Sequence, residues 1–199
     1  MKKYELLKSD TILVGDRTLF RIRRISDGEL GGYIEKEGNL SHNGDAWVYN
    51  NARVYDNAWV YNNARVYDNA RIYGNAWVFG NSWISENALV YENARVYDNA
   101  RIYGNAWVFG DARVYVNARV HDDARLSKPN ELVVITNLQY PITATKYHIQ
   151  IGCRQLTYHR WNKISEEEAI KMGLDPKNLI VFKTLIQALT INSSLNEKE

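Results

Sequence analysis

Four histidines and one cysteine are the side chains of this sequence that most often act as bases, nucleophiles or metal ligands: His42, His121, His148, His159 and Cys153. A histidine can be the general base of an acyl transfer, and a thiolate beside a histidine can be a nucleophile. A single cysteine excludes an intramolecular disulfide and a zinc site built on a cysteine cluster. The sequence has no metal-ligand spacing and no glycine-rich phosphate loop, so we predict neither a metal nor a cofactor.

The local patterns around these residues do not favour catalysis. In the segment HIQIGC, Cys153 shares the strand phase of Ile151, whereas His148 falls on the opposite face. We therefore expect Cys153 to be a small buried hydrophobic residue. His121 follows the apolar residue Val120, so a strand would point it to solvent. The sequence predicts no catalytic residue.

A repeat of six residues surrounds His121. From Asp45 to Leu126 the sequence forms fourteen consecutive hexads, each with a Val, Ile or Leu at the same position. Two residues earlier stands Ala in thirteen hexads and Ser82 in the other, and three residues earlier stands Asn or Asp. β-Branched residues favour extended backbone, and side chains two apart in a strand point the same way. The large apolar residue and the small residue are therefore predicted to be internal, in a parallel β-helix with turns at Asn.

The repeat consensus Val-Tyr-Asp-Asn-Ala-Arg resembles that of left-handed parallel β-helix proteins, a family that includes many hexapeptide-repeat acyltransferases. The resemblance covers residues 44–127 and implies a left-handed β-helix with three hexads per coil, so that residues eighteen apart lie above one another. Residues 28–52 (GELGGYIEKEGNLSHNGDAWVYNNA) also resemble the start of hexapeptide transferase-like proteins of enteric bacteria and prophages.

The chain departs from the enzyme pattern of that family in two respects. Aromatic residues follow the inward Val, where the enzymes often have Gly or Asp. No loop interrupts residues 45–126, so nothing would wall a pocket for a pantetheine arm. An acyltransferase remains the alternative function that the resemblance implies.

One eighteen-residue segment, NARVYDNARIYGNAWVFG, occurs at residues 63–80 and again at 93–110. The two copies are thirty residues apart, which is five hexads and not a multiple of three. With three hexads per coil, the second copy lies on a different face from the first. A site tied to one face would be lost by such a shift, so we interpret the duplicated segment as scaffold.

We expect a mostly β chain with three regions: an N-terminal cap at 1–43, the β-helix at 44–128, and strands plus two helices at 129–199. Residues 11–25 predict a β-hairpin around Gly15 and Asp16. The last predicted helix carries an apolar stripe, formed by Leu179, Phe182, Leu185, Ile186 and Leu189. This stripe is predicted to cover the last coil of the β-helix, the alternative being that it docks a partner.

The outward positions beside each internal residue hold Trp or Arg on one side and Tyr or Phe on the other. One predicted column on the first face consists of Trp47, Arg65, Trp83, Arg101 and Arg119. Rungs are ~4.8 Å apart, so Arg65 is expected between two indoles in cation–π contact. Such ladders either only stabilise the exterior or form a recognition surface, because Tyr, Trp and Arg are enriched at binding hot spots.

Two outward patches are predicted to mediate self-association or partner binding. The patch on the third face consists of Trp59, Tyr61, Trp77 and Phe79, and that on the second face of Leu89, Tyr91, Trp107 and Phe109. A ligand notch is predicted on the first face, where the small Ser85 stands between Tyr67 and Tyr103 with Trp83 beside it. An aromatic or sugar ring could stack there.

These observations predict a non-catalytic, cytoplasmic β-solenoid that presents aromatic and Arg ladders to a protein partner or to itself as a dimer or trimer. A phage or prophage inhibitor of a host system would suit this description. The net charge is only +2, and residues 44–127 hold eight Arg against nine Asp and Glu, so nucleic acid is an unlikely partner. No apolar run is long enough to span a membrane.

Overall fold

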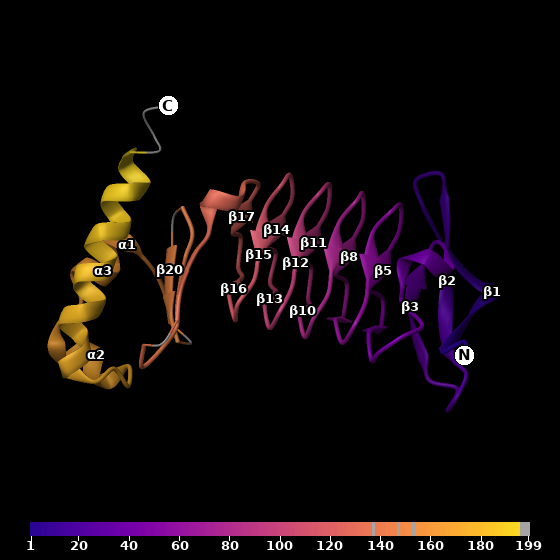
Figure 1. Cartoon of the computed structure of the whole chain (residues 1–199), viewed down its shortest axis with the longest axis horizontal. Helices are drawn as coiled ribbons and strands as arrows, with labels where there is room; N and C mark the ends of the chain where they lie inside the picture. The colour runs from indigo at the N-terminus through magenta and orange to yellow at the C-terminus, as the bar shows by residue number, and fades with distance from the viewer. Residues whose placement is uncertain (137, 147, 153, 196–199) are drawn as a thin grey trace. The chain divides into compact units, whose positions relative to one another are not determined.

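The structure is a computed structural model that describes residues 1–136, 138–146, 148–152 and 154–195. The chain divides into two compact units, Met1–Glu131 and Leu132–Glu199. Each unit is described by itself below. Figure 1 shows the repeated coils of the first unit and the helices of the second.

The first unit is built on a parallel β-solenoid of about five turns. Its fourteen short strands each begin six residues after the previous one: β4 (Trp47–Val48), β5 (Arg53–Val54), β6 (Trp59–Val60), β7 (Arg65–Val66), β8 (Arg71–Ile72), β9 (Trp77–Val78), β10 (Trp83–Ile84), β11 (Leu89–Val90), β12 (Arg95–Val96), β13 (Arg101–Ile102), β14 (Trp107–Val108), β15 (Arg113–Val114), β16 (Arg119–Val120) and β17 (Arg125–Leu126). Each strand pairs in parallel with the strand three positions away. Trp83, for example, pairs with Arg65 and Arg101, both eighteen residues distant.

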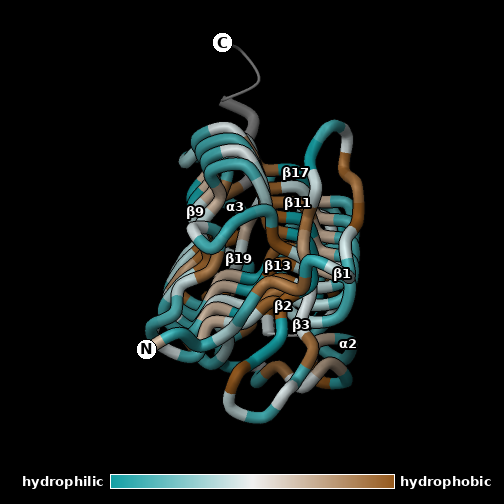
Figure 2. Tube along the Cα trace, turned by 90° about the vertical axis from the view of Figure 1, so that its right-hand side faces the viewer, coloured by the Kyte–Doolittle hydropathy of each residue, from teal (hydrophilic) through white to brown (hydrophobic). Residues whose placement is uncertain are grey.

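The interior of the solenoid consists of the apolar and small residues of the repeat. Val78 and Ala76 are fully buried, as are their counterparts in the other coils, except that Ala124 in the last hexad is partly exposed. Figure 2 shows apolar segments at corresponding places in successive coils. Because each buried Val or Ile contributes about 1.5–3 kcal/mol, this column is the main stabilising feature of a thin solenoid.

The corners of the coils combine left-handed backbone with ladders of Asn side chains. The residue before each repeat Asn has a positive φ, as at Asp56 (58°) and Gly74 (67°). The Asn side chains bond along the solenoid: Asn57 donates to Asn75, Asn75 to Asn93, and Asn93 to Asp111, each at 3.2 Å. A second ladder consists of Asn69, Asn87, Asn105 and Asp123. These bonds tie each corner to the next coil.

The third corner ladder is shorter and ends near an unusual residue, Val116. Asn63 donates to Asn81 and Asn81 to Asn99, but the described coils show no continuation from Asn99. One coil further on, Val116 has a φ of 49° and Asn117 a φ of 60°. A β-branched residue at positive φ is a genuine outlier, because its side chain clashes with its own backbone.

We expect Val116→Asn to raise the free energy of unfolding by about 1 kcal/mol, because asparagine tolerates this φ and valine does not. Asp98→Val places the same unfavourable residue at the corner one coil earlier, where φ is 58°, and should destabilise by a similar amount. Thermal melts followed by circular dichroism compare the two variants. Shifts of the same sign in both would contradict the assignment of strain to Val116.

The N-terminal cap extends one sheet of the solenoid. The structure contains the expected hairpin, formed by β1 (Tyr4–Val14) and β2 (Arg17–Arg24), with Gly15 at a φ of 63°. β2 pairs antiparallel with β3 (Leu30–Ile34), and β3 pairs in parallel with β5. A short 3-10 helix, η1 (Glu37–Asn39), then leads into the first coil. The cap thus covers the open edge that a parallel sheet would otherwise expose.

Glycines allow β3 to lie directly against the first coil. A Cβ atom on Gly32 would be 2.5 Å from the carbonyl oxygen of Ala52 and 2.7 Å from Cγ1 of Val48. A Cβ on Gly31 would be 2.6 Å from the carbonyl oxygen of Val48. Only residues without a side chain fit here, so the glycine pair determines how closely the cap approaches the coil.

The second unit is an antiparallel sheet covered by helices. Its strands are β18 (Val133–Ile135), β19 (Ile142–Ala144), β20 (His148–Ile151) and β21 (Arg154–Thr157), in that spatial order, preceded by the 3-10 helix η2 (Pro129–Glu131) at the end of the first unit. The helices are α1 (Tyr158–Asn162), α2 (Glu166–Lys171) and α3 (Pro176–Leu195). Ser165 caps α2 by accepting a bond from the amide of Glu168.

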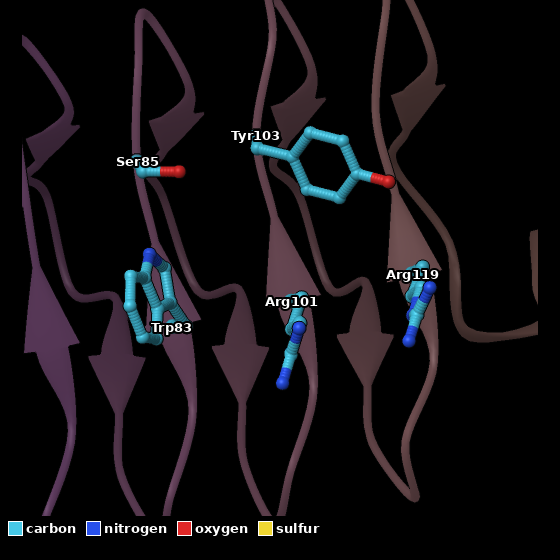
Figure 3. Close-up of a pocket in the computed structure, with 5 residues that line it drawn as sticks. All are labelled: Trp83, Ser85, Arg101, Tyr103 and Arg119. Atoms are coloured by element: carbon cyan, nitrogen blue, oxygen red, sulfur yellow. The ribbon is translucent and has the colours of Figure 1, made fainter. Parts of the chain in front are cut away.

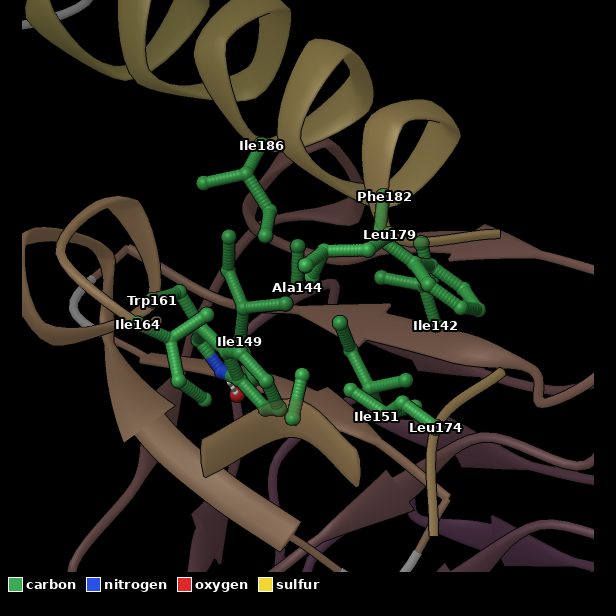
Figure 4. Close-up of a cluster of buried hydrophobic side chains, with 11 residues drawn as sticks. Ile142, Ala144, Ile149, Ile151, Trp161, Ile164, Leu174, Leu179, Phe182 and Ile186 are labelled. Carbon is green, nitrogen blue, oxygen red and sulfur yellow. Dashed lines mark hydrogen bonds between the residues drawn. The ribbon is translucent and has the colours of Figure 1, made fainter. Parts of the chain in front are cut away.

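The apolar stripe of α3 covers the sheet of its own unit. Leu179, Phe182 and Ile186 pack in one core with Ile142 and Ile149, and the indole of Trp161 donates to the carbonyl of Ile149 (2.7 Å), as Figure 4 shows. The expectation that this stripe covers the last coil was therefore wrong. The sheet needs a cover because one face of it is apolar, and α3 supplies that cover within the same unit.

Candidate functional site

Rings stack along the outside of the solenoid on all three faces. On the third face the column of Tyr61, Phe79, Tyr97 and Tyr115 has centroid separations of 4.8, 5.0 and 5.4 Å with nearly parallel planes. Strand spacing places one ring above the next, so the ladder follows from the repeat. Tyr61, Phe79 and Tyr97 are half-buried, whereas Tyr115 is exposed. Recognition over the first three would have to use the side chains that project beyond them.

The third face has the most exposed aromatic patch. Trp59 is 38% exposed and Trp77 is 39% exposed. Trp59 stacks on Tyr61 at 4.1 Å and meets Trp77 edge-on at 6.1 Å, while Tyr61 stacks on Phe79. These four residues, Trp59, Tyr61, Trp77 and Phe79, are called the third-face patch below. The structure brings all four together as the pattern predicted.

Arg95 borders the third-face patch, because its guanidinium lies over the indole of Trp77, 5.1 Å from the ring centroid. Two exposed indoles and one bordering cation make a surface of the composition found at interaction hot spots.

The corresponding patch on the second face is more covered. The N-terminal hairpin packs on the ring column of this face, where Leu19 contacts the cluster that contains Tyr55 and Tyr73. Burial raises the pKa of Tyr73 to about 12. Further along the face, the predicted patch residues Leu89, Tyr91, Trp107 and Phe109 are all half-buried. Arg125 also lies 4.4 Å from the centroid of Trp107.

On the first face, Trp47 is not an outward residue. It is 1% exposed, because Arg24 lies 4.6 Å from its ring centroid and Tyr4 meets it edge-on. Arg65 pairs with Trp47 and Trp83 on the neighbouring strands but makes no cation–π contact with the residues that the structure describes. The expected sandwich was wrong because the N-terminal cap, whose position the repeat does not encode, covers the first rung.

A hollow of about 190 Å³ lies beside Ser85 on the first face. The residues around it are Trp83, Ser85, Arg101, Tyr103 and Arg119 (Figure 3). The indole of Trp83 stacks on Tyr67 at 4.6 Å, so it fills the space between Ser85 and Tyr67. The hollow is therefore on the Tyr103 side of Ser85, and Tyr67 supports its Trp wall without lining it. Sequence reasoning did not assign the two arginines to the notch.

His121 is buried, contrary to the expected solvent exposure. Its residue exposure is 8%, its ring stacks on Tyr103 at 4.7 Å, and its Nδ1 lies 3.0 Å from a carboxylate oxygen of Asp122. Its Nε2 is buried without a hydrogen-bond partner in the described part of the chain. The alternation of one strand could not predict this burial.

The structure describes three further histidines. His42 stacks on Tyr4 at 4.3 Å and accepts a bond from the backbone amide of Lys3. His148 lies in β20, His159 is exposed in α1, and Cys153 lies outside the described residues. Among the residues described, no three His, Cys, Asp or Glu side chains are placed to hold a metal. None of the helices in the described ranges has the length and apolar content needed to span a membrane.

Comparison with known families identifies the repeat. The profile of a family described as YdcK Beta solenoid repeat matches residues 46–62, 64–80, 70–86 and 94–110. These segments cover less than half of the chain, and they lie within the coils. The chain is therefore similar to this repeat family over its solenoid. No curated protein matches the chain.

Proposed function

We propose that this protein is a non-catalytic interaction solenoid that self-associates, as a dimer or trimer, through the third-face patch. The observation that carries the proposal is the exposure of Trp59 and Trp77 side by side, 38% and 39%, on a rigid support of stacked rings. Large apolar side chains gathered on a soluble surface mark interaction sites, and symmetric self-association is the commonest use of such a patch.

We further assign the solenoid to the left-handed hexapeptide class, with three hexads per coil. The six-residue spacing of its strands and the eighteen-residue spacing of their pairing support this assignment. The single cysteine fits work in a reducing compartment such as the cytoplasm.

The geometry favours binding over the acyltransferase alternative. An acyl transfer needs a base whose free ring nitrogen meets the substrate. His121 is the histidine of the coils, its Nδ1 faces Asp122, and its Nε2 is buried. A substrate would have to displace the packing around the ring to reach it.

Trp77→Arg is the test of self-association. It leaves the buried Ala76 and Val78 in place, so the coil should fold, while a cation replaces the centre of the patch. Loss of a hot-spot tryptophan costs about 2 kcal/mol or more, so we expect dissociation to become about thirtyfold easier. Light scattering coupled to size-exclusion chromatography measures the mass over a range of concentrations.

Trp83→Arg is the matched control, because Trp83 is equally exposed (39%) but lies on the first face. It should leave the mass unchanged. A monomeric wild type, or an assembly that survives Trp77→Arg, would refute the proposal.

A further inference from the structure

We propose that the hollow beside Ser85 is a binding site for a small aromatic anion, a single planar ring that carries a phosphate or carboxylate group. The site is lined by Trp83, Ser85, Arg101, Tyr103 and Arg119. The hollow lies on a different face from the third-face patch, so ligand binding can be tested whether or not the protein self-associates.

The free face of the Trp83 indole is the first part of the site. In four places of the solenoid, an Arg directly follows a Trp on the next strand of the same sheet. In two of them the guanidinium covers the indole: Arg95 on Trp77 at 5.1 Å, and Arg125 on Trp107 at 4.4 Å. At Trp47, followed by Arg65, the cap residue Arg24 covers the indole instead. At the fourth place, Trp83 followed by Arg101, the described coils show no such contact. One face of Trp83 rests on Tyr67, and the other is left for a ring.

Ser85 is the cause of this difference. The rungs on either side of it in the same column carry Tyr67 and Tyr103, and a ring at position 85 would fill the space between them. Because the serine side chain is small, the indole of Trp83 tilts onto Tyr67, and the hollow opens toward Tyr103. Figure 3 shows Ser85 and Tyr103 in one row and Trp83, Arg101 and Arg119 in the other.

Two arginines give the site its charge preference. Arg101 and Arg119 are directly paired on neighbouring strands, so their side chains leave the sheet about 4.8 Å apart. Arg101 is exposed and makes no ion pair with any residue that the structure describes. Guanidinium groups bind phosphate and carboxylate in a bidentate manner.

The size of the hollow matches a single ring. Sites for drug-sized ligands and cofactors occupy about 300–1,000 Å³, whereas a cavity of about 150 Å³ admits benzene. At about 190 Å³ the hollow accommodates a ring whose anionic group extends toward the arginines.

Isothermal titration calorimetry on the full chain tests the site with matched probes. Phenyl phosphate and benzoate carry both ring and anion, inorganic phosphate carries the anion alone, and phenol carries the ring alone. We expect phenyl phosphate or benzoate to bind at least about tenfold more tightly than either partial probe, because stacking and charge-assisted bonds act together.

Two variants locate the binding. Arg101→Gln should weaken it about tenfold, because one charge-assisted contact is lost. Ser85→Tyr should weaken binding at least as much, because the new tyrosine ring would fill the hollow. The substitution suits the fold, since Tyr67 and Tyr103 occupy the equivalent positions of the neighbouring coils. Arg95→Gln, on the third face, is the control and should bind as the wild type does.

Melting curves of all variants verify folding. If Ser85→Tyr does not fold, the effect of Arg101→Gln on binding tests the site by itself. Ring-bearing probes that bind no more tightly than inorganic phosphate overturn the proposal. So does unchanged binding in Arg101→Gln or in a folded Ser85→Tyr.

Discussion

Deletion of residues 63–80 is expected to leave a folded solenoid, whereas deletion of residues 63–74 is expected to lower the melting temperature by about 10 °C. The first deletion removes β7, β8 and β9, one strand from each sheet, and joins two equivalent corners. Every downstream strand then keeps its face. Nearest-neighbour stacking predicts only a modest loss, since the remaining coils have the same contacts as before.

The shorter deletion removes two strands and moves every later strand to another face. Beneath the N-terminal hairpin, the place of Tyr73 would then be taken by Ser85, whereas after the longer deletion Tyr91 would occupy it. Replacing a packed ring by a small polar side chain costs about 3 kcal/mol, which corresponds to about 10 °C for a unit of this size. Calorimetric melts of both deletions measure the difference. Equal melting temperatures would mean that the coil does not consist of three hexads.

Gly32→Ala is expected to destabilise the N-terminal cap by about 2–3 kcal/mol, the upper part of the range for overpacking in a tight interior. The new methyl would meet the carbonyl oxygen of Ala52 at 2.5 Å. That oxygen cannot retreat freely, because it accepts the backbone bond from Tyr33 at 2.9 Å. Hydrogen exchange of the β1–β3 amides should therefore accelerate more than that of the later coils.

Gly38→Ala is the matched control for this change. A Cβ at Gly38 has no atom within 4 Å, and the residue does not need a positive φ. Its amide exchange and melting temperature should match those of the wild type. Equal behaviour of the two alanine variants would show that β3 does not depend on close approach to the first coil.

The solenoid could be predicted from the sequence because its determinants are local. Every hexad has a Val, Ile or Leu with an Ala, or once Ser82, two residues earlier, and a side chain of a strand has only two directions in which to point. The same argument placed Trp59 and Trp77 beside each other on one face. Where a residue's surroundings come from the next coil of the same repeat, periodicity is sufficient.

The errors lie where distant segments meet the repeat. Trp47 has the same local sequence as other outward tryptophans, but Arg24 and Tyr4 of the cap cover it. The α3 stripe was correctly predicted as apolar, yet an apolar stripe does not specify what it covers. In each case the sequence encodes the side chain, and long-range packing decides its surroundings.

The hydrogen bonds of the asparagine ladders all run in one direction along the solenoid, and this limits which coils can be duplicated. Each amide group donates toward the C-terminal neighbour and accepts from the N-terminal one, so the chain of bonds runs one way. Asp111 and Asp123 end two of the ladders, and a carboxylate can accept the last bond but has no proton to pass on. The second copy of the duplicated segment, residues 93–110, stops one residue before Asp111. Duplicated coils that lie N-terminal to Asp111 would lengthen the ladder of amide hydrogen bonds. A duplicated segment that included this aspartate would instead end the ladder in the middle of the solenoid.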